Sequence, residues 1–124
     1  MLFRSGVLSD AAAEASTGST ITVQELKAKI DGHDDYYLID VREPSEFEIV
    51  RIPTSHLIPK QGFIDGSALA ALPQNKPIIL HCKSGVRSAE CLAILKGAGF
   101  ADATHVAGGV VAWAKQIDTS LPVY

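Results

Sequence analysis

The sequence predicts a single α/β domain with a central, mostly parallel sheet and helices on both faces. Short apolar runs rich in strand-forming residues alternate along the chain with helical patterns, which is the order that a parallel sheet with crossover helices requires. The length of 124 residues suits one hydrophobic core. The apolar share of 47% and the charged share of 20% are ordinary for a globular protein.

The first 20 residues are predicted to be a flexible N-terminal segment or linker. Residues 9–20, SDAAAEASTGST, are small and polar and contain no aromatic or long aliphatic side chain. The folded domain is therefore expected over residues 21–124.

The first half of the domain alternates between helices and strands. Thr22 and Glu25 have the spacing of a capping box, which predicts a helix that ends near Asp31. YYLID, residues 36–40, is predicted to be a buried strand. The proline of EPSEFEIV favours a short helix over residues 43–50. A brief strand, HLI at 56–58, and one or two helical turns at 67–72 follow.

The second half repeats the alternation. PIILH, residues 77–81, is the clearest buried strand. SAECLAILKGAG, 88–99, is predicted to be a helix with a glycine at its C-terminal end. ATHV, 103–106, is a last strand, and VVAWAKQI, 110–117, a last helix. Because ligands of such sheets bind beyond the carboxyl ends of the strands, the stretch HCKSGVRS at 81–88 lies at the expected binding edge.

The loop after the strand at 77–81 combines a thiol with an anion-binding backbone. Cys82 directly follows the strand and Ser88 is expected to start the helix, so the intervening backbone N–H groups can point toward the sulfur. Gly85 permits the backbone conformation that such a loop needs. Positive charge in the loop and the N–H groups stabilise a thiolate, which is a nucleophile that attracts anionic substrates. Cys82 is therefore the predicted catalytic residue, and the predicted active-site loop comprises Lys83, Ser84, Gly85, Val86, Arg87 and Ser88.

For most of the other cysteine and histidine residues the sequence favours a structural role. A cysteine at the end of a core strand is often inert, but the neighbouring cations and glycine favour function for Cys82. Cys91 lies within an apolar helix without a nearby cation and is expected to be a small core residue. The four histidines do not cluster at metal-ligand spacing. Neither a metal site nor a cofactor is predicted.

Cysteine phosphatases build a similar strand, loop and helix, with five residues between the cysteine and an arginine. Here only KSGV separates Cys82 from Arg87, and Ser88 stands where a phosphatase would have its arginine. The shorter loop is too small for a tetrahedral phosphate. A phosphatase or arsenate reductase is nevertheless kept as the enzymatic alternative, and a non-catalytic binding module as a third reading.

HCKSGVRS, the upstream LIDVREPSEFEIVRIP and the downstream GGVVAW together resemble a rhodanese (sulfurtransferase) domain over residues 21–124. EIVRIP and the ending GGVVAWAKQIDTSLPVY resemble the C-terminal rhodanese domain of adenylyltransferase/sulfurtransferases of the MoeB and ThiF type. The resemblance implies a persulfide on Cys82, an anionic donor bound by Arg87, and supporting ion pairs from Asp40 and Arg42.

The implied donor is thiosulfate or the persulfide of a cysteine desulfurase. The implied acceptor is a thiophilic compound, and the resemblance includes a ubiquitin-like sulfur carrier protein of molybdopterin or thiamine biosynthesis among the candidates. Adenylation of that carrier would need an E1-like adenylating domain, which these 124 residues do not supply.

One segment departs from the resemblance. Residues 50–55 read VRIPTS where a common family form reads GHIPGA. A β-branched residue adopts a positive φ only at a cost, so a type I or open turn is expected at Thr54.

Charge and hydropathy exclude two partner classes. A formal net charge of -3 and a pI near 5.7 do not favour nucleic acid or an anionic membrane. No apolar run approaches the roughly 20 residues that span a bilayer, and the N-terminus lacks the apolar core of a secretory signal. A cytoplasmic location is therefore expected.

Overall fold

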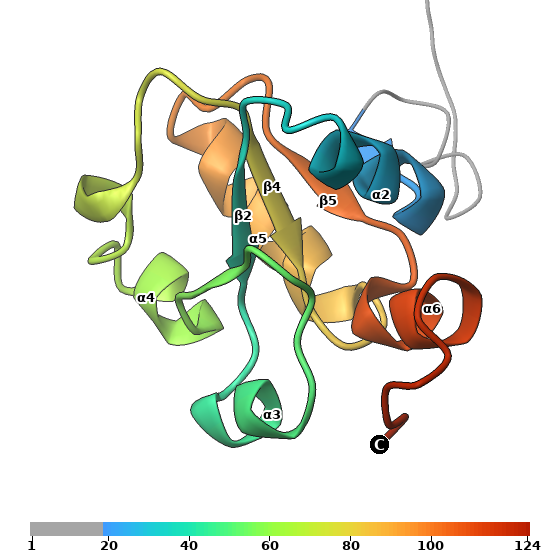
Figure 1. Cartoon of the computed structure of the whole chain (residues 1–124). Coiled ribbons are helices and arrows are strands. Elements are labelled where there is room, and N and C mark those ends of the chain that lie inside the picture. Colours follow the sequence, from blue (N-terminus) through green and yellow to red (C-terminus); the bar gives the residue numbers. More distant parts are fainter. Residues whose placement is uncertain (1–18) are drawn as a thin grey trace, which may run out of the picture.

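The computed structural model describes residues 19–124, which form an all-parallel five-stranded sheet in the order β1-β5-β4-β2-β3 (Figure 1). The strands are β1 (Thr20–Ile21), β2 (Tyr37–Asp40), β3 (His56–Leu57), β4 (Ile78–His81) and β5 (Thr104–Val106). The predicted α/β class with a parallel sheet is confirmed. Residues 1–18 of the predicted linker lie outside the described part of the chain.

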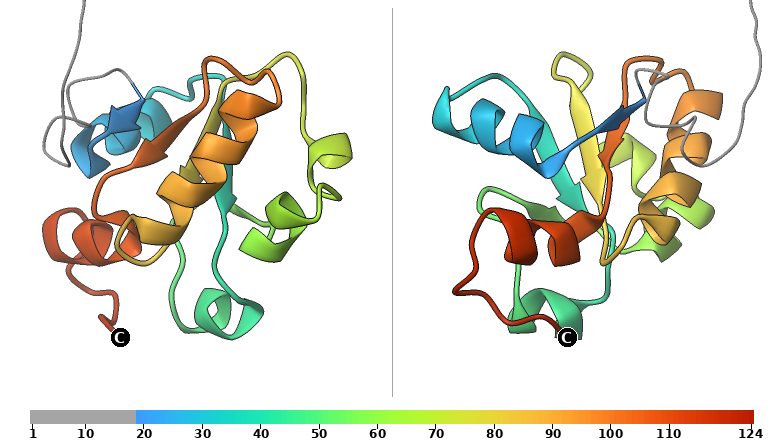
Figure 2. Two further views of the ribbon diagram at one scale, coloured as in Figure 1. Left: turned by 180° about the vertical axis from the view of Figure 1, so that it is seen from behind. Right: turned by 90° about the vertical axis from the view of Figure 1, so that its right-hand side faces the viewer.

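Helices cover both faces of this sheet. Their bounds are α2 (Val23–Asp31), α3 (Pro44–Ile49), α4 (Lys60–Ile64), the 3-10 turn η1 (Leu69–Ala71), α5 (Val86–Gly97) and α6 (Gly109–Gln116). Seen edge-on, α2 and α6 lie on one face, and α4 and α5 lie on the other (Figure 2). None of the helices within residues 19–124 is long and apolar enough to cross a bilayer.

Two apolar clusters fill the spaces between the sheet and these helices. Alternate strand residues supply both clusters, because successive side chains of a strand point to opposite faces. Leu38 and Ile79 pack with Trp113 on the α2–α6 face. Ile39 and Leu80 pack with the α4–α5 face. Trp113 is only 3% exposed and anchors α6 in the cluster on the α2–α6 face.

Strands β2 and β4 pair directly, and their register brings their last residues side by side. Asp40, the last residue of β2, pairs with His81, the last residue of β4. The backbone N–H of Val41 donates to the His81 carbonyl at 3.0 Å and extends the pairing by one residue. The stretch DVRE, residues 40–43, and the cysteine loop therefore leave the sheet side by side.

Most predicted elements are confirmed to within one or two residues. The sequence reading missed β1, which has only two residues, and α4, whose five residues carry no clear start signal. It also placed the start of α5 at Ser88, which is wrong. The helix begins at Val86, because Gly85 at φ 119° turns the chain early enough to act as the N-cap.

The turn predicted at Thr54 is also wrong. Thr54 adopts a φ of 72°, the left-handed conformation that was expected to be avoided. The turn is held by Ser55, whose backbone N–H and hydroxyl both donate to the Ile52 carbonyl. The Thr54 hydroxyl also shares a hydrogen bond of 2.9 Å with the Tyr36 hydroxyl. These contacts offset a backbone strain of about 1–2 kcal/mol.

Candidate active site

Cys82 lies at the carboxyl edge of the sheet, in the first position after β4. Its sulfur accepts the backbone N–H of Gly85 at 3.1 Å and that of Ser88 at 3.4 Å. The thiol also lies 3.5 Å from the Ser88 hydroxyl. Backbone N–H groups of the loop are thus directed at the sulfur, which is the geometry that the sequence predicted for this loop. The residue is only 1% exposed, so the loop encloses the sulfur closely.

The double glycine after β5 holds this loop from the other side. The first N–H groups of α6 donate to the loop carbonyls: Val110 to Cys82 at 2.9 Å and Val111 to Lys83 at 3.1 Å. A Cβ on Gly109 would lie 2.3 Å from the Cys82 carbonyl oxygen. Gly109 is therefore required by the close approach of α6 to the cysteine loop, which connects two motifs that lie far apart in the sequence.

Ser88 joins the loop to β5. Its hydroxyl contacts the Gly85 carbonyl at 3.2 Å and Nδ1 of His105 at 2.8 Å. Ser88 is fully buried and His105 is 6% exposed. Sequence reading singled out Ser88 but did not assign His105 to the site, because a lone histidine in a strand gives no signal of a contact 17 residues away.

The two cations of the loop both have partners. Arg87 makes a bidentate ion pair with Glu46 of α3, with N–O distances of 2.8 and 3.0 Å. The Nζ atom of Lys83 lies 4.4 Å from the centre of the Tyr124 ring, a cation–π contact. The remaining loop side chains point outward: Ser84 is exposed, and Val86 is 68% exposed.

Glu46 and Tyr124 were not predicted as site residues. Tyr124 donates from its hydroxyl to Glu46 Oε1 at 2.6 Å and accepts from Arg42 at 2.7 Å. Glu46 also accepts the N–H of Glu43 at 3.0 Å, which closes a capping box at the start of α3. The E-P-S-E spacing was a visible signal for that cap, but the contacts with Arg87 and Tyr124 depend on the tertiary fold.

Asp40 and Arg42 form a buried ion pair beneath the site, and each side chain is 0% exposed. The guanidinium donates to the Asp40 carboxylate from Nε and Nη2, at distances between 2.7 and 3.1 Å, and to the Val50 carbonyl. Buried charges require this kind of pairing. The pair fixes the end of β2 beside the cysteine loop, in line with the supporting role that the sequence reading gave it.

His81 is buried and uncharged at neutral pH. Burial lowers its pKa to about 4, against the opposing effect of Asp40, whose carboxylate lies 3.8 Å from Nε2. A ring nitrogen that stays neutral in this way is not a cation for a donor anion. His81 is therefore part of the packing between β2 and β4.

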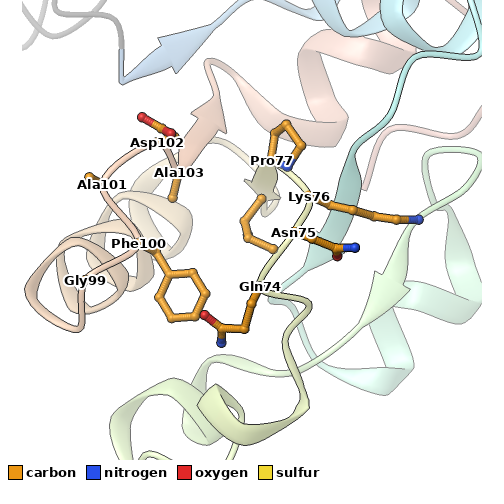
Figure 3. A pocket seen from close by; sticks show the side chains of 10 residues that line it. Gln74, Asn75, Lys76, Pro77, Gly99, Phe100, Ala101, Asp102 and Ala103 are labelled. Atoms are coloured by element: carbon orange, nitrogen blue, oxygen red, sulfur yellow. The ribbon is translucent and has the colours of Figure 1, made fainter.

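A hollow of about 360 Å³ lies at the opposite edge of the sheet (Figure 3). Residues before β4 and before β5 line it, among them Gln74, Pro77 and Phe100. These positions are at the amino ends of the strands, so the hollow is separate from Cys82. In residues 19–124, no three His, Cys, Asp or Glu side chains gather in a way that could hold a metal ion.

Comparison with known proteins agrees with this geometry. The family described as "Rhodanese-like domain" matches residues 22–116. The chain is 51% identical over 119 residues to the "Probable adenylyltransferase/sulfurtransferase MoeZ" of Mycobacterium tuberculosis, covering 96% of this chain and 30% of that protein. It is 32% identical to the "Adenylyltransferase and sulfurtransferase MOCS3-2" of Zea mays, covering 84% of this chain and 23% of that protein. The chain thus spans less than a third of either relative.

A solved structure supports the same assignment. The rhodanese-like domain protein of Staphylococcus aureus superposes with a TM-score of 0.70 at 33% identity, covering 86% of this chain and 98% of that one. The family match, these relatives and the shared architecture agree with the resemblance drawn from HCKSGVRS, DVRE and GGVVAW. The chain belongs to the rhodanese family and is related to the rhodanese domains of adenylyltransferase/sulfurtransferases.

Proposed function

We propose that the protein transfers sulfane sulfur through a persulfide on Cys82. The observation that carries the proposal is the pair of backbone N–H groups, from Gly85 and Ser88, that converge on the cysteine sulfur. Such preorganised donors stabilise negative charge where a persulfide would form and cost no rearrangement during the reaction.

In the first step the Cys82 thiolate attacks the outer sulfur of thiosulfate. A new S–S bond forms to Cys82, the S–S bond of thiosulfate breaks, and sulfite leaves with the bonding electron pair. The products are the Cys82 persulfide anion and sulfite, so the total charge is unchanged. The persulfide of a cysteine desulfurase would react in the same way, with the desulfurase thiolate as the leaving group.

In the second step an acceptor thiolate, or cyanide in an assay, attacks the outer sulfur of the persulfide. The S–S bond on Cys82 breaks and the cysteine leaves as a thiolate, ready for another cycle. Two half-reactions through one covalent intermediate predict ping-pong kinetics. The cycle needs a reduced thiol, which a cytoplasmic location would supply.

The relatives suggest a physiological acceptor. Both are named adenylyltransferase and sulfurtransferase, which supports a ubiquitin-like sulfur carrier with an adenylated C-terminus as the acceptor. In this proposal the adenylating domain lies outside these 124 residues, and the rhodanese domain delivers sulfur to the activated carrier.

The loop geometry disfavours phosphate chemistry. Ser88 stands where a phosphatase would have an arginine, and its hydroxyl contacts Gly85 and His105 instead. Arg87 faces Glu46, so no unpaired guanidinium of the loop is directed at a phosphate. The intact loop around Cys82 likewise disfavours a purely non-catalytic binding module.

The test is a single-turnover experiment without acceptor. Protein mixed with thiosulfate should release about one equivalent of sulfite per Cys82, and later addition of cyanide should yield an equal amount of thiocyanate. Absence of sulfite with thiosulfate, followed by absence of persulfide with a charged desulfurase, would contradict the proposal. Hydrolysis of an aryl phosphate by the same preparation would instead support the phosphatase alternative.

A further inference from the structure

We infer that Glu46 is a specificity-determining residue that disfavours small dianionic donors such as thiosulfate. Its carboxylate is already paired with the Arg87 guanidinium that would bind such donors. The inference rests on the proposed sulfur transfer through Cys82 and concerns which donors that site accepts. It biases the site toward donors that bring less negative charge to Arg87.

The Arg87 guanidinium is already paired with a carboxylate. Both terminal nitrogens of Arg87 contact the two carboxylate oxygens of Glu46, at 2.8 and 3.0 Å. This fork-to-fork geometry is the one that a donor's oxyanion would itself adopt with an arginine. A donor that uses Arg87 must therefore displace Glu46 or bind close to its charge.

Glu46 is also held in place by contacts other than Arg87. Tyr124 donates to Oε1 at 2.6 Å, and the N–H of Glu43 donates to Oε2 at 3.0 Å. The side chain is only 17% exposed. Four hydrogen bonds from three residues therefore hold the carboxylate, which does not swing away freely.

The carboxylate is charged at every physiological pH. The hydrogen bonds with Arg87 lower the pKa of Glu46 to about 2. The same contacts raise the pKa of Arg87. A negative charge thus stands beside the loop cation that an anionic donor would use.

The other cations near the loop do not replace Arg87. The Arg42 guanidinium is fully buried and paired with Asp40. Lys83 rests on the ring of Tyr124. Among the described residues of the loop, the remaining donors to an anion are uncharged: the exposed Ser84 hydroxyl and the backbone N–H groups, two of which already hold the Cys82 sulfur.

Two donors with the same sulfur chemistry and different charge test this inference. Thiosulfate carries two negative charges, and methanethiosulfonate carries one; each loses its outer sulfur to a thiolate and releases sulfite or a sulfinate. The measured quantity is the ratio of kcat/KM for thiosulfate to kcat/KM for methanethiosulfonate, at one low ionic strength because salt screens such effects.

Glu46→Gln keeps the size of the side chain and the capping contact with Glu43 but removes the charge. The variant should raise the donor ratio roughly three- to tenfold, since a freed guanidinium binds the dianion more strongly than the monoanion. Glu46→Asp, which keeps the charge but shortens the side chain, should raise the ratio by less and gives a second reading if Glu46→Gln does not fold.

The matched control is Glu48→Gln, because Glu48 is exposed on the same helix and the substitution removes the same charge. It should leave the ratio within about twofold, since exposed charges act weakly at a distance. In an Arg87→Ala background the effect of Glu46→Gln should disappear, because the coupling requires both partners.

The outcomes for the role of Glu46 and for sulfur transfer itself can be told apart. An unchanged ratio in Glu46→Gln, or an equal rise in Glu48→Gln, would overturn the role of Glu46 while sulfite release by the wild type left the sulfur transfer intact. Absence of sulfite, sulfinate and persulfide with every donor would overturn the proposed function itself.

Discussion

The two cysteines of this protein are buried almost equally and have different surroundings. Cys82 is 1% exposed and Cys91 is 0% exposed, and both belong to the same apolar cluster beneath α5. The Cys82 sulfur accepts two backbone N–H groups at the carboxyl end of β4. Cys91 lies in the middle of α5, where the backbone N–H groups are used by the helix itself.

Burial is the main cause that raises the pKa of the Cys91 thiol to about 12, and it outweighs the opposing effect of Lys60. A cysteine surrounded by apolar groups stays protonated and unreactive, whereas one with converging N–H groups has donors for a negative charge. Access to water therefore does not separate the two thiols, since both are buried. They differ in the backbone N–H groups directed at the sulfur, and we propose that this difference is why Cys82 and not Cys91 carries the reaction.

The largest expected effect comes from replacing each cysteine in turn. Cys82→Ser should reduce thiocyanate formation from thiosulfate and cyanide by about 10³-fold or more, because serine forms no persulfide. Cys91→Ala should keep activity within about twofold and cost about 1 kcal/mol of stability from lost packing. Steady-state rates measure the activity and urea unfolding measures the stability of each variant. A loss of activity in folded Cys91→Ala would mean that Cys91 also takes part in the reaction.

The second effect concerns alkylation of Cys91. In Cys82→Ser, iodoacetamide at pH 8 should modify the remaining thiol about 100-fold more slowly in the folded protein than in urea, because reaction requires opening of the core. Mass spectrometry over time gives both rates. Rapid modification of the folded variant would mean that Cys91 is accessible and that its environment is not the inert one described above.

The third effect comes from a matched pair of glycines. Gly109→Ala places a Cβ 2.3 Å from the Cys82 carbonyl oxygen, so the loop must shift. We expect a loss of about 2 kcal/mol in stability and at least a tenfold loss of activity. Gly97→Ala, at the end of the helix that holds Cys91, meets no atom within 4 Å and should be neutral or stabilising by up to about 1 kcal/mol. Equal behaviour of the two variants would contradict the role of α6 in shaping the loop.

The smallest effect is the dependence of stability on pH. The pKa of Glu46 is lowered from 4.5 to about 2 in the folded protein, chiefly by Arg87. A lowered pKa adds stability above the unfolded value and loses it as the pH falls from about 4.5 toward 2. The stability difference between wild type and Glu46→Gln should therefore be largest near neutral pH and shrink below pH 4.5. The buried His81 is present in both proteins and cancels in that difference. A constant difference across this range would contradict the ion pair.

The sequence predicted the position of Cys82 because a buried strand followed by a glycine-containing loop and a helix is a local pattern. The strand predicted at 36–40 likewise ends at Asp40, and the carboxyl ends of parallel strands meet at one edge of a sheet, so DVRE lies beside the cysteine loop. Local patterns do not report contacts between distant residues. The bond between Ser88 and His105, the ion pair of Arg87 with Glu46, and the position of Tyr124 all depend on tertiary packing. The sequence therefore indicated two cations near the site, and the fold determines that each has a partner.

The turn at Thr54 shows a second limit. Sequence reasoning assigned the cost of a positive φ correctly but could not include the hydrogen bonds from Tyr36 and Ser55 that offset it. Tertiary contacts override a local preference of about 1–2 kcal/mol readily.

We propose that converging N–H groups, and not burial, make one of two buried cysteines the residue that forms the persulfide. Intact-protein mass spectrometry after incubation with thiosulfate measures this, with Cys82→Ser and Cys91→Ala beside the wild type. We expect a gain of one sulfur atom in the wild type and in Cys91→Ala, and no gain in Cys82→Ser. A gain that persists without Cys82, or that requires Cys91, would mean that the N–H groups do not select the reactive thiol.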